Sequence, residues 1–150
     1  MPKQKTVYII RPFGMLFRHT IRQRIRSAGL SILASRQLKI PRWAFEKIYP
    51  RKKHPDMPDE VWVRRLVLTT GGISEVGILE GEDAVAQLVR LVGHRPDPAE
   101  CEAGTIRGDY GASAVECIDG FVFHLRVIHR PENVKEALHD LPIIEKLLCD

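Results

Sequence analysis

Strand-like and helical segments alternate along this chain in an order that few folds can accommodate. Four short β-rich runs are expected at residues 5–10, 30–40, 73–79 and 121–128. Helical segments are expected at residues 20–28, 41–49, 60–68, 82–92 and from 131 to near 142. This order predicts an α+β fold, a ferredoxin-like α/β sandwich in which helices pack on a four-stranded antiparallel sheet.

Length and composition indicate that residues 1–150 form a single domain. A hydrophobic content of 44% with 28% charged residues is ordinary for a soluble globular protein of this size. No apolar run approaches the roughly 18 residues that span a bilayer, so we expect neither a membrane partner nor a secretory signal. The three cysteines are an odd number without a metal-binding spacing, which favours a reducing, cytoplasmic location.

Charge is divided unevenly between the two halves of the chain. Residues 1–65 carry 16 Lys and Arg against 4 Asp and Glu, whereas residues 66–150 carry 7 against 15. A basic half can attract nucleotides or nucleic acid. It can equally face the acidic half within the fold or in an oligomer, which is the interpretation we favour.

The segment Gly104-Thr-Ile-Arg-Gly-Asp109 places an arginine between two glycines, in a long polar loop expected over residues 94–109. Glycine allows a close backbone approach to a ligand, and a guanidinium offers a fork of donors that matches a phosphate. No other Lys or Arg occurs between Arg95 and Arg126, and acidic residues surround Arg107. A generic basic surface therefore does not account for Arg107, and we predict that it binds phosphate.

The same segment, followed by the aromatic Tyr110, resembles a hallmark of the nucleoside diphosphate kinase family. Near the N-terminus that family has an apolar strand ending in Lys-Pro-Asp-Gly, and Val7-Tyr-Ile-Ile-Arg-Pro-Phe-Gly14 lies at the matching distance. Further matches follow in the family's order over nearly the whole chain. They are Tyr49 closing the second helix, Trp62 in a helical hairpin, Val76-Gly-Ile-Leu-Glu-Gly81 ending a strand, and Val127-Ile-His129 before the last helix.

In the family that this chain resembles, a histidine takes the terminal phosphoryl group of a nucleoside triphosphate and passes it to a nucleoside diphosphate. A neutral imidazole, with an ordinary pKa of about 6.5, can attack phosphorus at neutral pH. His129 is the expected nucleophile, because the residues after it resemble the family's last helix. His124 is the alternative. In one extended strand, two histidines five residues apart face opposite sides and cannot both enter one pocket.

The resemblance also implies how the nucleotide is held. Arg11 stands at the position of a family lysine, and with Arg107 it is expected to bind the phosphates. Arg95 could add a contact from the loop. Tyr49 is expected beside the nucleophile, and Trp62 is expected where an aromatic side chain stacks on the base.

Several family residues are altered in this chain. The family's second phosphate arginine falls at or next to Val89, and Arg90 is displaced by one position around the helix. Arg126 replaces an asparagine three residues before the histidine. A Ser-Asp pair after the histidine is shortened to Arg130-Pro131, which leaves Glu132 as the expected support that orients the imidazole.

These features favour a magnesium-dependent nucleoside diphosphate kinase that binds nucleoside triphosphates and diphosphates and forms homo-oligomers. The family assembles as tetramers or hexamers, and Mg²⁺ would bind mainly through nucleotide phosphates, with no protein metal motif. One alternative is a regulatory, nucleotide-binding protein that kept the fold and lost turnover. Another is a nucleic-acid-binding protein that uses the arginine-rich first helix and Arg51-Lys-Lys53.

Overall fold

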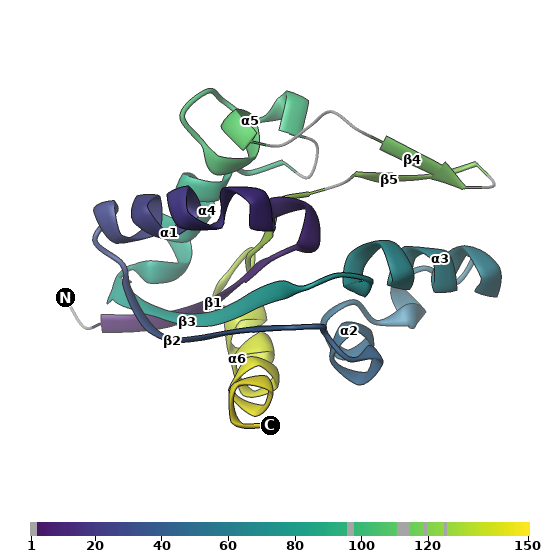
Figure 1. The fold of residues 1–150 in the computed structure, drawn as a ribbon, viewed down its shortest axis with the longest axis horizontal. Coiled ribbons are helices and arrows are strands. Elements are labelled where there is room, and N and C mark those ends of the chain that lie inside the picture. Colours follow the sequence, from purple (N-terminus) through teal and green to yellow (C-terminus); the bar gives the residue numbers. More distant parts are fainter. Residues whose placement is uncertain (1–2, 96–97, 111–114, 119, 125) are drawn as a thin grey trace.

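A four-stranded antiparallel sheet forms the centre of the protein (Figure 1). The computed structural model describes residues 3–95, 98–110, 115–118, 120–124 and 126–150. The strands of the central sheet lie in the order β2-β3-β1-β6, and a separate two-stranded sheet contains β4 and β5. Their bounds are β1 Lys3–Ile10, β2 Ser31–Leu38, β3 Ser74–Glu82, β4 Val115–Ile118, β5 Phe121–His124 and β6 Ile128–His129.

Helices pack on the central sheet, as predicted, and they cover both of its faces. Figure 1 shows α1 and α4 on one face, α6 on the other, and α2 with α3 beside the end of the sheet. The α-helices are α1 Arg18–Ser27, α2 Arg42–Ile48, α3 Asp59–Thr70, α4 Ala84–Val92, α5 Ile106–Tyr110 and α6 Val134–Cys149. Short 3₁₀ helices are η1 Pro12–Phe17, η2 Arg51–Lys53 and η3 Pro98–Glu100. No helix in the described part of the chain is long and apolar enough to cross a membrane.

The sequence of β1 explains why helices pack on both sides of it. Side chains alternate across a strand, so Tyr8 and Ile10 join the core beneath α1 and α4, whereas Val7 and Ile9 join the core against α6. All four side chains are buried. This strand therefore ends, at Ile10, between two hydrophobic cores and beside β6.

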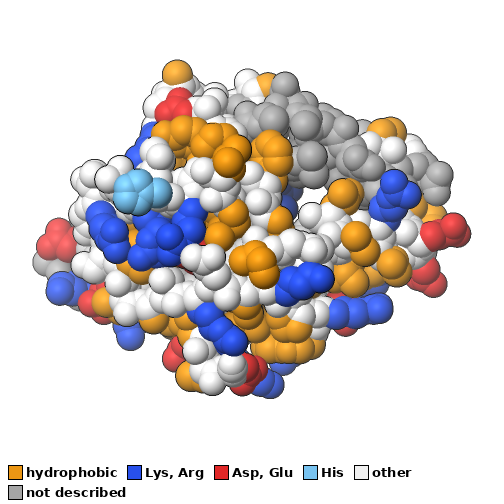
Figure 2. Space-filling view, viewed as in Figure 1, with side chains coloured by type: hydrophobic (Ala, Val, Ile, Leu, Met, Phe, Trp, Pro, Cys, Tyr) orange, Lys and Arg blue, Asp and Glu red, His pale blue; other side chains and the backbone are white. Residues whose placement is uncertain are grey.

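A fully buried carboxylate, Glu75 on β3, joins the acidic half of the chain to the arginine-rich helix α1. It accepts hydrogen bonds from Tyr8 (2.6 Å), Arg18 (2.5 Å) and Arg22 (2.7 Å). On the surface, Lys and Arg side chains gather over α1, at the left of Figure 2. At Arg18 and Arg22 the basic half thus faces the acidic half within the fold, as favoured from the sequence.

We expect Glu75→Gln to lower the free energy of unfolding by about 2 kcal/mol, because an amide cannot accept from three donors as a carboxylate does. Burial would raise the pKa of Glu75, but the hydrogen bonds from Tyr8, Arg22 and Arg18 hold it below the ordinary value of 4.5. The carboxylate's contribution is therefore complete above pH 4.5 and is lost as the pH falls through the lowered pKa. Urea unfolding across pH measures both effects. An equal acid sensitivity in Glu75→Gln would contradict this assignment.

The strand expected at residues 121–128 is wrong in its extent. Its first half, β5, pairs with β4 and follows Gly120, which has a φ of 84°. Of the described residues after β5, Ile128 and His129 are the ones that join the central sheet. The last helix also continues past Pro142, because Ile144 and Leu147 are buried against the sheet beyond it. Burial of such side chains, at roughly 1.5–3 kcal/mol each, offsets the roughly 3 kcal/mol cost of an internal proline.

The loop expected at residues 94–109 contains two short helices, η3 and α5, so Arg107 lies on a helix. Thr105 precedes α5, and its hydroxyl accepts a hydrogen bond from the backbone N–H of Gly108 (3.0 Å), as an N-terminal cap does. Gly108 is needed for close approach, since a Cβ there would lie 2.2 Å from the carbonyl oxygen of Glu102. The spacing of Thr105 and Gly108 therefore serves the helix start that brings Arg107 into the site.

Candidate active site

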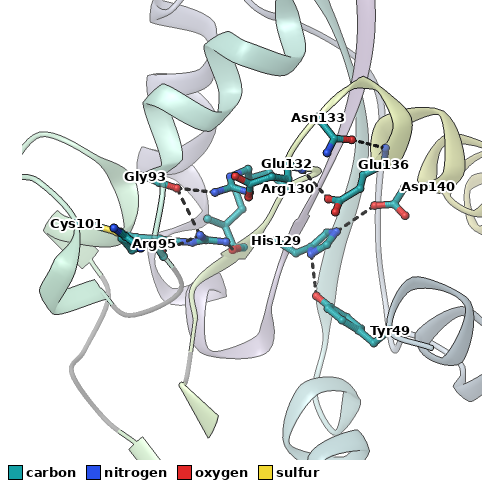
Figure 3. Close-up of polar contacts among 12 residues, drawn as sticks. Tyr49, Gly93, Arg95, Cys101, His129, Arg130, Glu132, Asn133, Glu136 and Asp140 are labelled. Atoms are coloured by element: carbon teal, nitrogen blue, oxygen red, sulfur yellow. Dashed lines mark hydrogen bonds and ion pairs between the residues drawn. The ribbon is translucent and has the colours of Figure 1, made fainter. Parts of the chain in front are cut away.

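His129 lies at the end of β6 with both ring nitrogens engaged (Figure 3). Nδ1 is 2.8 Å from the Tyr49 hydroxyl, and Nε2 is 3.2 Å from Oδ2 of Asp140. An ionised carboxylate only accepts, so the network assigns the ring proton to Nε2, and Tyr49 donates to the lone pair of Nδ1. The Tyr49 hydroxyl in turn accepts from the guanidinium of Arg11. This donor chain makes Nδ1 the nucleophilic atom of the imidazole.

The surroundings keep the imidazole neutral and the carboxylate charged. Burial lowers the pKa of His129 below 6.5 and outweighs Asp140, while the charges of Arg11 and Arg107 lower it further. Burial would raise the pKa of Asp140, but its hydrogen bonds to His129 and His139 and their charges hold that pKa below its usual value. A neutral ring beside a carboxylate is the state that nucleophilic attack requires at neutral pH.

Asp140, which supports the imidazole, was not predicted from the sequence. The expected support, Glu132, instead pairs with Arg130 at 2.8 Å, and its backbone N–H donates to Glu136 (Figure 3). Glu132 lies two residues after Arg130 along the chain, and its carboxylate forms an ion pair with that guanidinium. The imidazole is reached from α6 instead, eleven residues after His129.

The pattern of α6 did contain a signal for Asp140. The helix begins after Asn133, whose side chain accepts from the backbone N–H of Glu136. Ala137, Ile144 and Leu147 form a buried stripe at helical spacing, and Asp140 lies within that stripe with 4% exposure. A single acid inside an apolar stripe is rarely buried without a partner.

Arg107 enters the site from α5 and is almost completely buried, with 2% exposure. Its terminal nitrogens donate to the carbonyl oxygens of Arg95 (3.0 Å), Ile128 (3.1 Å) and Gly93 (3.4 Å). Burial, with the charge of Arg130 next in effect, lowers the pKa of Arg107 to about 9. The side chain is therefore still a cation at neutral pH, held beside the strand that carries His129.

A cleft of about 740 Å³ opens over these residues. Its lining includes His129, Tyr49 and Asp140, with more cations than acids around them. The cationic lining residues are Lys52, Lys53, Arg107, Arg126, Arg130 and Lys135, against Glu132, Glu136 and Asp140. Because six Lys and Arg side chains face three carboxylates, the net charge of the cleft lining is positive. The arrangement suits a polyanionic ligand beside a nucleophilic imidazole.

Comparison with known proteins identifies the chain. The model of the nucleoside diphosphate kinase family matches residues 4–144. The chain belongs to the nucleoside diphosphate kinase family. A curated nucleoside diphosphate kinase of Saccharolobus solfataricus is 30% identical over 146 residues, or 95% of either chain. One of Sulfurisphaera tokodaii is 30% identical over 149 residues, covering 97% of this chain and 91% of the relative.

Solved structures of nucleoside diphosphate kinases have the same fold. A Borrelia burgdorferi enzyme, solved as a transition-state mimic with vanadate and ADP, has a TM-score of 0.78 at 23% identity, covering 94% of this chain and 86% of that one. The Pyrobaculum aerophilum enzyme has a TM-score of 0.73 at 25% identity, covering 95% of both chains. The resemblance and the ferredoxin-like α+β fold are confirmed. Family membership supports nucleoside diphosphate kinase activity and does not favour the alternatives.

Trp62 and Arg95, which were expected to hold the nucleotide, are not among the residues that line the cleft around His129. Trp62 has 3% exposure and packs in a cluster with Phe45, and the guanidinium of Arg51 lies 5.3 Å from its ring centroid. Trp62 borders a separate cleft, without His129. Arg95 is exposed and contributes its backbone carbonyl to the site.

His124, the alternative nucleophile, lies in β5, where its backbone pairs with Val115. Its side chain lies outside the part of the protein that the structure describes. His129 is instead in the central sheet of this nucleoside diphosphate kinase fold. The two histidines therefore belong to different sheets, and the argument that placed them on opposite faces of one strand does not apply.

We expect Arg107→Lys to lower the free energy of unfolding by about 1–3 kcal/mol, although the charge is retained. One ammonium cannot reach the carbonyl oxygens of Gly93, Arg95 and Ile128 in the geometry of the guanidinium fork, so buried acceptors lose their donors. Urea unfolding measures the change. The matched control is Arg90→Lys at an exposed arginine of α4, expected to remain within roughly 0.5 kcal/mol of wild type. Equal stabilities of the two variants would contradict the bracing role of Arg107.

Proposed function

We propose that this protein transfers the γ-phosphoryl group of a nucleoside triphosphate to a nucleoside diphosphate through a phosphohistidine at His129. The supporting observation is the donor chain on the imidazole. Asp140 accepts from Nε2, which leaves the lone pair of Nδ1 for bonding to phosphorus. This nucleophile lies in a cleft with an excess of positive charge.

In the first half-reaction, Nδ1 of His129 attacks the γ-phosphorus. The N–P bond forms as the bond from phosphorus to the β,γ-bridging oxygen breaks, and the nucleoside diphosphate leaves with that electron pair. The proton stays on Nε2 and remains hydrogen-bonded to Asp140, whose charge offsets the positive charge that the ring acquires. Tyr49 gives up its hydrogen bond to Nδ1 when the phosphoryl group takes that place.

In the second half-reaction, a terminal oxygen of the acceptor diphosphate attacks the phosphorus on His129. The N–P bond breaks, its electron pair returns to Nδ1, and the product triphosphate leaves. The proton stays on Nε2 throughout, hydrogen-bonded to Asp140, so the ring begins and ends the cycle in one tautomer. Both half-reactions depend on positioning and charge, which the chain supplies through fixed side chains.

Arg11 and Arg107 are proposed to hold the phosphates. Arg11 contacts the Tyr49 hydroxyl, which is the group that touches Nδ1, so a phosphate arriving at the imidazole meets this guanidinium. Arg107 lines the cleft, and its buried Nε has no hydrogen-bond partner among the described residues. A contact from the exposed side chain of Arg95 stays a prediction.

The family uses a divalent cation with the nucleotide, and we propose Mg²⁺ for this chain. Among the residues that the structure describes, no three His, Cys, Asp or Glu side chains are grouped as a metal site. The cleft acids Glu132 and Asp140 already have cationic or N–H partners. This donor set fits a cation held mainly by nucleotide phosphate oxygens and water, where it would neutralise phosphate charge.

Base stacking on Trp62 remains a proposal with a structural condition. The guanidinium groups of Arg51 and Arg65 lie 5.3 and 5.6 Å from the ring centroid. Arg51 also donates to the backbone carbonyl oxygens of His54 and Met57. A base can reach the indole face only if one of these arginines moves aside, or it can stack on the guanidinium itself.

Members of the family bind nucleotides and are generally oligomeric, and we propose that this chain forms homo-oligomers. Nucleic-acid binding by the basic half has less support, because Arg18 and Arg22 pair with Glu75, and Arg24 pairs with Asp109. No disulfide joins Cys101, Cys117 and Cys149 in the described structure, which fits the proposed cytoplasmic location.

The experiment that tests this function is phosphoryl labelling. The purified protein is incubated with γ-labelled ATP and Mg²⁺, and it should acquire label that is acid-labile and base-stable, as expected of phosphohistidine. Addition of an unlabelled nucleoside diphosphate should then move the label to the nucleotide. A protein that binds ATP but takes up no label would reject the kinase proposal and favour a regulatory nucleotide-binding protein.

A further inference from the structure

Arg126 is a cleft residue that the proposed reaction has not yet used. It lies two residues before β6 and lines the same cleft as Arg107, His129 and Arg130. Its Nε is buried and has no hydrogen-bond partner within the described residues. Burial, followed by the charges of Arg11, Arg65 and Arg130, lowers its pKa to about 10, so the side chain is a cation at neutral pH.

The neighbouring arginines differ from Arg126 because each has its own anchor. Arg130 has 5% exposure and donates to Glu132 and to the carbonyl oxygen of Gly93, both at 2.8 Å. Arg107 donates to three carbonyls, and Arg11 donates to Tyr49. Arg65 lies over the rings of Tyr49 and Trp62. These contacts account for the positions of the other arginines, but none of them involves Arg126.

Seven cationic side chains thus act on Arg126 or share its cleft, and no carboxylate of the cleft is paired with it in the described structure. Glu132 is bonded to Arg130, and Asp140 to His129 and His139. Keeping a guanidinium among like charges costs stability unless an anion joins them. A phosphate chain is an anion of the correct chemistry, since each of its oxygens accepts and its charge offsets several cations.

We propose that Arg126 is a further phosphate-binding residue, which contacts the oxygens of the phosphate chain next to His129. Three cleft arginines, Arg107, Arg126 and Arg130, have a buried Nε without a partner among the described residues. Arg107 and Arg130 are anchored through their terminal nitrogens, whereas Arg126 has no such anchor in the described structure and can turn its donors toward a ligand beside the nucleophile. Arg95, the additional phosphate contact expected from the sequence, has an exposed side chain, as does the displaced Arg90. The inference rests on the proposed function for the identity of the ligand, a nucleoside triphosphate.

The test compares Arg126→Gln with wild type and with Arg90→Gln, a matched control on the exposed face of α4. Calorimetry measures the dissociation constants for ATP with Mg²⁺ and for inorganic tripolyphosphate with Mg²⁺. Arg126→Gln should weaken both by roughly 10- to 100-fold, because one charge-assisted contact is lost. Arg126→Lys should recover part of the loss, and Arg90→Gln should bind as wild type does. If Arg126→Gln does not fold, Arg126→Met keeps the aliphatic stem and provides the same comparison.

The outcomes separate this inference from the proposed function. Wild-type affinity of Arg126→Gln for both ligands would overturn the inference, and so would weaker ATP binding with unchanged tripolyphosphate binding, which would place Arg126 at the sugar or base. Wild-type protein that binds neither ligand would overturn it as well. Wild-type protein that binds both but never becomes labelled from γ-labelled ATP would reject the kinase proposal, while lost phosphate affinity in Arg126→Gln would still support the inference.

Discussion

The His129→Ala protein is expected to acquire no label from γ-labelled ATP and to lose at least roughly 10⁴-fold in turnover. Alanine removes the Nδ1 lone pair, and no second histidine contacts the Tyr49 hydroxyl in the described structure. Electrostatic contacts from Arg11 and Arg107 would remain, so ATP should still bind. Label retention on the protein and a coupled assay of diphosphate phosphorylation measure the two losses separately.

Two further variants make that result specific. His129→Gln retains an amide N–H that can donate to Asp140, so it limits the cost of leaving a buried carboxylate unpaired, yet it has no nucleophilic nitrogen. It should fold as wild type does in urea unfolding and remain unlabelled. His124→Ala should retain the label, because β5 belongs to the other sheet. Loss of label in His124→Ala alone would move the nucleophile to the β4–β5 hairpin and refute our site.

The parts of the fold that depend on local pattern were predictable. The apolar run ending at Ile10, the helix α1 with Ile21 and Ile25 on one face, and the glycine turn before β3 follow from periodicity and turn chemistry. His129 and Arg107 were identified through the family resemblance, and the structure brings both into one cleft. In each of these places the local preference of the sequence agrees with the packing of the whole chain.

The elements whose bounds were predicted wrongly are those whose bounds depend on packing between residues far apart in the sequence. The run at residues 121–128 is apolar except at His124 and Arg126, and this pattern alone does not show that β5 ends and a separate strand, β6, begins within it. The division is set by β4, which pairs with the first half of the run. Likewise, α6 continues beyond Pro142 because Leu147 packs on the sheet, an interaction between residues far apart in the sequence. Strand pairing and core packing override local propensity in both cases.

Packing between distant parts of the chain also decides which side chains support the site. Glu132 is the acid nearest to His129 along the chain, and sequence distance alone made it the expected support. Asp140 is the support because two turns of α6 return its carboxylate to the end of β6. Arg126 gains its position in the same way, from the packing of a short strand beside β1. The chemistry of the site was predictable in kind, whereas its supporting residues needed the fold.

Asp140→Asn is expected to lower the rate of phosphohistidine formation by roughly 10²- to 10³-fold on the neutral pH plateau. A carboxylate accepts at both oxygens, from His129 and His139, whereas an amide accepts at one position and donates at the other. If its NH₂ faces Nε2, the ring proton moves to Nδ1 and blocks attack. If its oxygen faces Nε2, the tautomer is kept but the negative charge that offsets the developing ring charge is lost.

The pH dependence distinguishes this effect from simple misfolding. The hydrogen bond and charge of Asp140 raise the pKa of His129, so their removal lowers a pKa that burial already holds below 6.5. The imidazole of Asp140→Asn therefore stays neutral to lower pH, and the acid limb of its rate profile should move down as the plateau falls. Asp140→Glu, which retains the charge, should recover part of the plateau, and Glu145→Gln at an exposed acid of α6 should leave the profile unchanged. An acid limb that moves up in Asp140→Asn would mean that the carboxylate does not stabilise the protonated ring, and the donor chain from Arg11 to Asp140 would have to be reassigned.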